Sequence, residues 1–219
     1  MLIEIDRLQL ATNDPNTAIG RWRTLLGAEQ SDRDRIRCLS AERTTLRVGR
    51  SIVEILSADG TGLVADAVAR RGPHMFSAGA STLDVAAVDQ QLAAYTDNRT
   101  LENDQLFVDG ADIGIPGLRL VISPHEERSA VGDLDYLYEA TILAEDADGL
   151  TARFASVFAL DAQAFVQIDS PRFGYTGKLT LFRERELHRF EVITPTDMDK
   201  TMGRFFGKTG PCLYMSFAE

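Results

Sequence analysis

The sequence predicts an α+β protein in which tandem β-α-β-β-β units form curved mixed sheets around a cavity. Two observations predict this fold class. A short alternating strand, a helix-capping aspartate and an amphipathic helix occupy residues 5–27, and the same order of features returns at residues 138–158. Further landmarks recur at nearly the same spacing, so residues 1–73 and 131–211 are predicted to be copies of one unit.

The first unit opens with the strand and helix that define this pattern. Asp14 suits the N-cap of a helix, Pro15 suits its first position, and Gly27 is a natural C-terminal stop. The apolar residues that share one face of this helix are Ile19, Trp22, Leu25 and Leu26. We therefore expect the helix to pack against a sheet along that face.

The later elements follow from alternating apolar residues for strands and helical spacing for helices. The first unit continues with a charged loop or strand edge at 32–37, strands at 44–48 and 51–56, and a connecting helix at 61–70 that ends at Gly72-Pro73. The second unit has a strand at 75–83, a helix at 85–95, a polar, turn-rich stretch at 97–104, strands at 106–108 and 118–122, and an acidic linker at 124–133. The third unit has strands at 137–143, 165–168, 178–183 and 188–193, and a connecting helix at 197–206 that ends at Gly207.

Matching positions in the first and third units keep nearly constant offsets. Asp14 and Asp146 are 132 residues apart, and Glu54 and Glu191 are 137 residues apart. Small loop insertions produce a drift of this size. We therefore expect the two units to superpose with Glu54 over Glu191, and with Arg7 over Glu139.

These units divide the chain into two predicted domains, residues 1–130 with two units and residues 131–219 with the third. Residues 212–219 would be the first strand of an incomplete fourth unit. The strand at 213–217 would then leave an unpaired edge or pair with another chain, which predicts a homodimer.

Composition excludes several classes of function. The net charge of −10 argues against a nucleic-acid partner, because phosphate binding needs clustered Lys and Arg. No apolar run approaches the length of a membrane span, and the N-terminus does not resemble a signal peptide, so no membrane partner and a cytoplasmic location are expected. Cys38 and Cys212 lack metal-site spacing and are predicted to be reduced thiols.

The repeated unit and its first strand, Ile5-Asp6-Arg7-Leu8-Gln9-Leu10-Ala11 followed by Asp14, resemble the vicinal oxygen chelate superfamily. This superfamily includes glyoxalase I, methylmalonyl-CoA epimerase, extradiol dioxygenases and bleomycin resistance proteins. The resemblance implies paired units whose sheets curl around a cavity, with residues 1–130 as a glyoxalase-like domain. It also implies a divalent metal held by residues of the first strands, usually His, and of the fourth strands, usually Glu.

The positions implied for metal ligands lack the usual histidines. The pairs of first-strand and fourth-strand positions are Arg7 with Glu54 in the first unit, Phe76 or Ser77 with Arg119 in the second, and Glu139 with Glu191 in the third; Tyr214 or Met215 takes the first-strand position of the fourth. A guanidinium carries a permanent positive charge and no lone pair for a metal, so Arg7 cannot be a ligand. We therefore expect no metal cofactor; if a divalent metal binds, Glu139 and Glu191 are the candidate ligands.

Two sets of polar residues remain as candidate ligand-binding sites. In the first unit, Arg7 and Gln9 share a strand face opposite Glu54, and Arg119 would point into the same cavity beside Phe76. Either Arg7 is an electrophile or an anion anchor that Glu54 orients, or the two form a structural salt bridge. In the third unit, the corresponding set is Glu139, Thr141, Arg189 and Glu191. It is a carboxylate metal site, a proton-transfer pair or a neutral rim network.

The function expected from these residues is binding of a small organic molecule by a glyoxalase-like protein without the usual metal. The arginines indicate an anionic ligand. An alternative is a metal-dependent lyase, isomerase or extradiol-type dioxygenase with glutamate ligands. A second alternative is a degenerate scaffold whose exposed sheets serve dimerisation.

Overall fold

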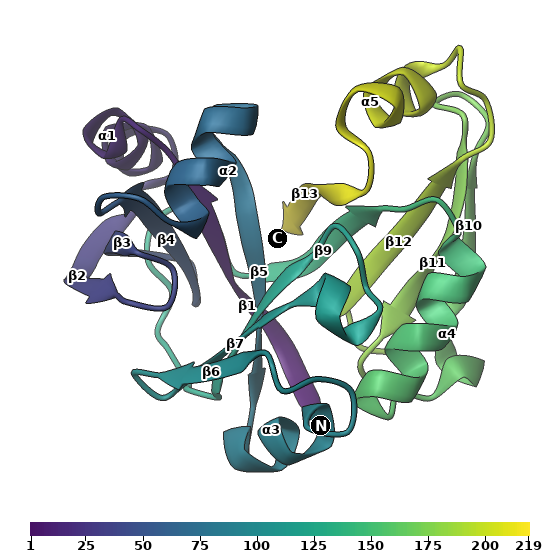
Figure 1. Cartoon of the computed structure of the whole chain (residues 1–219), viewed down its shortest axis with the longest axis horizontal. Helices are drawn as coiled ribbons and strands as arrows, with labels where there is room; N and C mark the ends of the chain where they lie inside the picture. Colours follow the sequence, from purple (N-terminus) through teal and green to yellow (C-terminus); the bar gives the residue numbers. More distant parts are fainter.

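The computed structural model describes residues 1–219 and contains two mixed sheets that lie side by side (Figure 1). One has eight strands in the order β2-β3-β4-β1-β5-β8-β7-β6, and the other five, in the order β10-β11-β12-β9-β13. The strands are β1 (Leu2–Ala11), β2 (Glu29–Ile36), β3 (Ala41–Val48), β4 (Ser51–Ala58), β5 (His74–Thr82), β6 (Arg99–Glu102), β7 (Gln105–Asp109), β8 (Arg119–Pro124), β9 (Leu137–Leu143), β10 (Val166–Ser170), β11 (Tyr175–Leu181), β12 (Arg189–Pro195) and β13 (Cys212–Ala218). The α-helices are α1 (Pro15–Leu26), α2 (Leu63–Arg71), α3 (Val85–Leu92), α4 (Ala147–Phe158) and α5 (Thr201–Thr209). The predicted α+β class with curved mixed sheets is confirmed.

The helix caps that the sequence predicts are present in the structure. The side chain of Asp14 accepts a hydrogen bond from the backbone N–H of Thr17 at 3.1 Å, and Asp146 accepts one from Gly149 at 3.0 Å. Gly27 ends α1 in the left-handed conformation, at φ 64°. The assignment of Leu25 to the packed face was wrong, since this side chain is 71% exposed.

The two edge strands of the eight-stranded sheet are the ones that the sequence patterns identify least well: β6 was missed, and β2 was predicted only as a charged loop or strand edge at 32–37. β2 pairs only with β3, and β6 pairs only with β7. Most of their side chains are exposed or half-buried, so their residues show no alternation of apolar and polar types. The stretch 97–104, predicted as turns, therefore contains a strand.

The first and fourth strands of a unit pair in parallel at the centre of each sheet. Gln9 in β1 lies opposite Glu54 in β4, and Thr141 in β9 lies opposite Glu191 in β12. Arg7 and Glu139 each precede these positions by two residues, on the same face of their strands. The strand pairing thus places two polar sets at matching positions in the two sheets.

The two sheets share one hydrophobic core. Its residues come from β1, β5, β7 and β8 of the larger sheet, from β9 and β12 of the smaller one, and from α3 and α4. Phe154 of α4 stacks on Phe190 of β12 with 5.0 Å between ring centroids. Apolar side chains of this core take one face of each strand, which leaves the polar residues of the alternate positions on the other face.

The concave face of the larger sheet is closed at one end and open at the other. A second cluster, which includes Ile36, Phe76, Phe107 and Val121 and is covered by α2, fills the closed end. The polar residues of β1, β3 and β4 lie toward the open end. The polar side chains at the open end can therefore share a cavity, whereas the apolar side chains at the closed end are packed together.

Strand β13 forms one edge of the five-stranded sheet. It pairs antiparallel with β9, as β5 pairs with β1, and no strand is hydrogen-bonded to its other edge. In the larger sheet, β5 has β8 on that side.

None of the helices combines the length and the apolar character needed to cross a membrane. The two cysteines are free thiols, Cys38 half-buried and Cys212 buried. Burial and the neighbouring carboxylate of Glu102 raise the pKa of Cys38 to about 12, so its thiol stays protonated at neutral pH.

Candidate functional site

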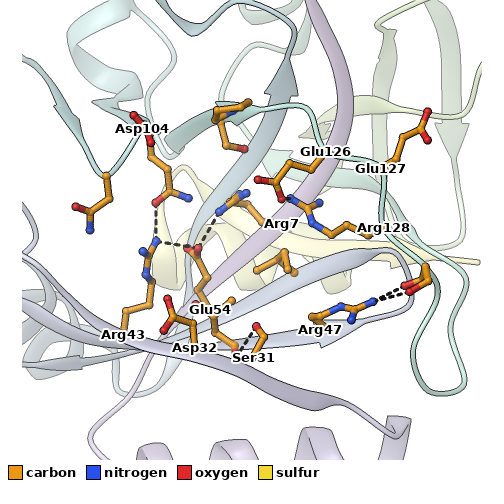
Figure 2. A pocket seen from close by; sticks show the side chains of 17 residues that line it. Arg7, Ser31, Asp32, Arg43, Arg47, Glu54, Asp104, Glu126, Glu127 and Arg128 are labelled. Carbon is orange, nitrogen blue, oxygen red and sulfur yellow. Dashed lines mark hydrogen bonds and ion pairs between the residues drawn. The ribbon is translucent and has the colours of Figure 1, made fainter.

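A cavity of about 580 Å³ opens on the concave face of the eight-stranded sheet (Figure 2). Residues of β1, β3, β4 and β8 form its floor. Its rim consists of Ser31, Asp32, Arg47, residues 103–105 and residues 126–129. Ile52 is its one hydrophobic lining residue among 17. Because small-molecule pockets are usually lined mainly by apolar side chains, so polar a lining favours a hydrophilic ligand.

Glu54 is at the centre of the cavity floor and is 1% exposed. Its Oε1 accepts hydrogen bonds from Nη1 of Arg7 at 2.8 Å and from Nη1 of Arg43 at 2.9 Å (Figure 2). Its Oε2 accepts a bond from Nε2 of Gln9 at 2.7 Å. Three donors thus hold this carboxylate, and two of them carry a positive charge.

Further carboxylates neutralise the arginines of the floor. Arg7 contacts Asp6 through Nη2 at 3.0 Å, and Arg43 contacts both oxygens of Asp34, at 2.8 and 2.7 Å. Burial opposes the charge of Arg7, but attraction to Asp6 and Glu54 outweighs it, and the pKa of the guanidinium is raised. The floor is therefore a network of two arginines and three carboxylates whose formal charges nearly cancel.

Gly79 in β5 makes room for Arg7. A Cβ at this position would overlap Cγ of Arg7, so the side chain lies directly across the backbone of β5. A glycine inside a strand pattern is the sequence signal for such a close approach. Sequence reasoning overlooked this signal, and also the roles of Asp6, Asp34 and Arg43, which no spacing rule connects to Arg7.

Arg119 and Phe76 do not share this cavity, contrary to the expectation from the sequence. Arg119 lines a separate cavity of about 510 Å³, pairs with Asp109 at 3.2 Å and lies over the ring of Phe76 at 4.8 Å. Phe76 belongs to the buried cluster at the closed end. On β8, the buried Val121 lies between Arg119 and Ser123, so the two cavities meet opposite ends of the strand.

The second polar set comes together on the five-stranded sheet. Oγ1 of Thr141 lies 2.6 Å from Oε2 of Glu191 and 3.2 Å from Oε1 of Glu139, and Nε of Arg189 donates to Oε2 of Glu139 at 2.6 Å. A hydroxyl has one proton and can donate to one carboxylate only. A proton on the other carboxyl group would let that group donate to the same hydroxyl.

Glu191 is a carboxyl group whose affinity for a proton is raised. Burial raises its pKa to about 7; the bond from Thr141 opposes the shift, and the charge of Glu139 adds to it. Glu139 is instead neutralised by Arg189. At neutral pH the pair can hold or release a proton, as a general acid or base does.

Neither set fits a divalent metal of the kind that the resemblance implies. In the first set a guanidinium stands at the ligand position, and both oxygens of Glu54 are taken by donors. In the second set, Arg189 takes one carboxylate, and no third acidic, His or Cys side chain joins the pair. A catalytic zinc site has three protein ligands, which is more than either set supplies.

Comparison with solved structures finds similar folds at low sequence identity. A triple mutant of 4-hydroxymandelate synthase from Streptomyces coelicolor matches with a TM-score of 0.70 and 15% identity, over 97% of this chain and 70% of that one. Methylmalonyl-CoA epimerase from Mycobacterium tuberculosis matches with a TM-score of 0.50 and 15% identity, over 57% of this chain and 90% of that one. Neither protein-family models nor curated proteins give a match. At this identity the likeness is one of fold.

Proposed function

Because this chain has the fold of the vicinal oxygen chelate superfamily, we propose that it is a glyoxalase-like protein that binds a small, oxygen-rich organic molecule without the metal of that superfamily. One observation carries the proposal: the 580 Å³ cavity has an almost wholly polar lining over an ordered floor of buried ion pairs. Such a floor holds its donors in fixed positions before a ligand arrives, which lowers the cost of ordering on binding.

The arginines of the floor supply donors for ligand oxygens. A guanidinium has five N–H hydrogens, and Arg7 uses three of them on Asp6 and Glu54. The remaining two support binding of a hydroxyl, carbonyl or carboxylate oxygen. Because the carboxylates already neutralise these arginines, a neutral or zwitterionic ligand is favoured over a strongly anionic one.

The lining as a whole agrees with this ligand class. It contains four arginines and five carboxylates, so its formal charge is −1. Carboxylates at the rim, such as Asp32 and Asp104, would accept hydrogen bonds from hydroxyl or ammonium groups (Figure 2). Sugars, polyols and amino acids carry both kinds of group.

A thermal-shift screen with sugars, polyols, amino acids and hydroxy acids at millimolar concentration tests the proposal. We expect at least one class to raise the thermal midpoint, and rim variants Arg47→Ala and Asn103→Ala to reduce the shift. The control is Arg119→Gln, in the other cavity. The proposal would be contradicted if both rim variants kept the shift and Arg119→Gln lost it. The ligand would then bind in the cavity lined by Arg119.

Proton transfer is a second candidate function, favoured by the Thr141 hydroxyl between Glu139 and Glu191. The metal-dependent lyase, isomerase or dioxygenase alternative would need both carboxylates as ligands, whereas Arg189 already binds one of them. A proton shared between the carboxyl groups needs no further partner. Enzyme-catalysed exchange of carbon-bound hydrogen in D₂O, lost in Glu191→Gln, would test this candidate.

A further inference from the structure

The cavity of about 510 Å³ that Arg119 lines differs in character from the polar cavity above Glu54. Six of its 14 lining residues are hydrophobic, against one of 17 in the polar cavity, and the two cavities share no lining residue. Small-molecule sites are mostly apolar, with a few polar groups that fix the orientation of the ligand. The lining of this cavity therefore suits a partly apolar molecule.

Three segments supply the apolar part of the wall. Leu39, in the turn between β2 and β3, and Phe107 of β7 belong to the buried cluster that α2 covers, so packing holds them in place. Leu63, at the start of α2, is 47% exposed. An apolar group bound against these side chains would leave water and would also cover Leu63, which favours binding.

The polar part of the wall is centred on Arg119 of β8. Its guanidinium lies over the ring of Phe76 at 4.8 Å, and its Nη2 is 3.2 Å from Oδ2 of Asp109. Oδ1 of Asp109 accepts a hydrogen bond from the backbone N–H of Ala111 at 3.1 Å. The aromatic ring and the anchored carboxylate thus hold the guanidinium in place before a ligand arrives.

Arg119 is less engaged with the protein than the arginines of the polar cavity. Arg7 and Arg43 donate hydrogen bonds to carboxylates. Arg119 has an ion pair with Asp109, and its Nε is buried without a hydrogen-bond partner. Ser77 of the neighbouring parallel strand β5 adds a hydroxyl to the same wall. A guanidinium only donates, so this wall favours a ligand with an acceptor oxygen.

The charges of the lining favour an uncharged acceptor. The charged residues that line the cavity are two arginines and three aspartates, so their formal charge is −1: Arg99, Arg119, Asp97, Asp109 and Asp112. A ligand carboxylate would bring a further negative charge close to Asp109, and like charges placed together oppose binding. The carbonyl oxygen of an amide or a ketone accepts hydrogen bonds without adding this charge.

We propose that this cavity is a second ligand site, which binds an uncharged amide or ketone with an apolar body. The carbonyl oxygen accepts a hydrogen bond from the guanidinium of Arg119, and the apolar body covers Leu39, Leu63 and Phe107. The site goes beyond the proposed function, because it lies in a different cavity and takes a different class of molecule.

Isothermal titration calorimetry with phenylacetamide, phenylacetate and acetamide tests the ligand class. Phenylacetate has the same apolar body with a charged head group, and acetamide has the same head group without the body. We expect phenylacetamide to bind at millimolar concentration, and more tightly than either of the other two. Absence of phenylacetamide binding, or tighter binding of phenylacetate or acetamide, would overturn the proposal.

Substitutions in the wall test the residues. Arg119→Met keeps the aliphatic stem over Phe76 but removes the donors, so it should weaken phenylacetamide binding by about 10-fold, as loss of a hydrogen bond to a charged group does. Leu63→Ser should weaken it less. Leu25→Ser is the matched control, because this helical leucine is 71% exposed and lies outside the cavity. Unchanged affinity in Arg119→Met, with circular dichroism showing a folded protein, would refute the site.

Modification of Cys38 by a thiol reagent locates the ligand in the unmodified protein. Cys38 lines the cavity and is half-buried, whereas Cys212 is buried, and Cys38→Ser identifies the signal of each. The measurement is made at alkaline pH, because the pKa of Cys38 is raised to about 12. We expect saturating phenylacetamide to slow the modification several-fold. An unchanged rate would mean that the ligand binds elsewhere.

These outcomes are independent of the thermal-shift screen. The rim variants used there, Arg47→Ala and Asn103→Ala, change residues that line the polar cavity only. Either site can therefore fail its test while the other passes.

Discussion

Arg7 is buried, so its positive charge has to be balanced by nearby carboxylates. The residue is 5% exposed and bonds both Asp6 and Glu54. A buried ion pair that loses one partner leaves an uncompensated charge, and this is costly even where the intact pair contributes little. The network therefore constrains the variants that the floor tolerates.

Arg7→Ala is expected to lower the free energy of unfolding by about 3 kcal/mol, because Asp6 and Glu54 keep their charges with fewer partners. Urea unfolding monitored by circular dichroism measures the change. Arg33→Ala is the control, since this side chain is 68% exposed and should alter stability by less than about 0.5 kcal/mol. Similar small effects for both variants would mean that Arg7 is not part of a buried network.

Glu191 predicts a pH dependence of stability. Its pKa is about 7 in the folded protein and near 4.5 without the fold, so the folded state binds the proton more tightly. The stabilisation is complete below about pH 4.5 and is lost as the pH rises through 7, on the order of 2 kcal/mol. Urea unfolding at pH 5 and pH 8 should show this loss, and Glu191→Gln should abolish it. An identical pH dependence in Glu191→Gln would rule out the shared proton.

The same residues predict no response to divalent ions. Because Arg189 neutralises Glu139, we expect the thermal midpoint to be unchanged by millimolar magnesium, manganese or EDTA. A stabilisation that saturates with one of these ions and disappears in Glu191→Gln would instead favour the metal-dependent alternative.

At the scale of elements, replacing a glycine by alanine should have opposite effects on stability in strand β5 and in helix α1. Gly79 of β5 lies under Arg7, whereas a Cβ added to Gly20 of α1 would have no atom within 4 Å. Gly79→Ala should lower the free energy of unfolding by about 1–3 kcal/mol, as overpacking does. Gly20→Ala should raise it by up to about 1 kcal/mol through helix propensity. Thermal and urea unfolding of the two variants check both signs, and a neutral Gly79→Ala would show that Arg7 moves aside freely.

At the scale of the whole molecule, β13 has a hydrogen-bonded strand partner on one edge only. Unpaired edges associate with other strands, so a homodimer remains our prediction. Light scattering well above micromolar concentration should give twice the monomer mass, and Phe217→Lys should reduce it, because Phe217 of β13 is half-exposed and a charge there opposes association. A monomer under these conditions would contradict the prediction.

Much of the architecture follows from local signals. The caps at Asp14 and Asp146 and the alternation in β1 and β9 need only neighbouring residues, so the sequence alone determined the fold class and the course of the central strands. Constant offsets placed Glu54 and Glu191 at matching positions, and the registers with Gln9 and Thr141 agree.

Only the tertiary structure decided which side chains meet. Pairing of β3 with β4 brings Arg43 to Glu54, curvature of the larger sheet brings Gln105 of β7 to Arg43, and the buried Val121 lies between this site and Arg119. Packing of the two sheets brings Glu4, His125 and His188 together across a long stretch of chain. Local periodicity determines the face of a strand on which a side chain lies. The residues that this side chain contacts depend on how the sheet twists and on how the two sheets pack. Many side chains that are distant in the sequence determine that packing together.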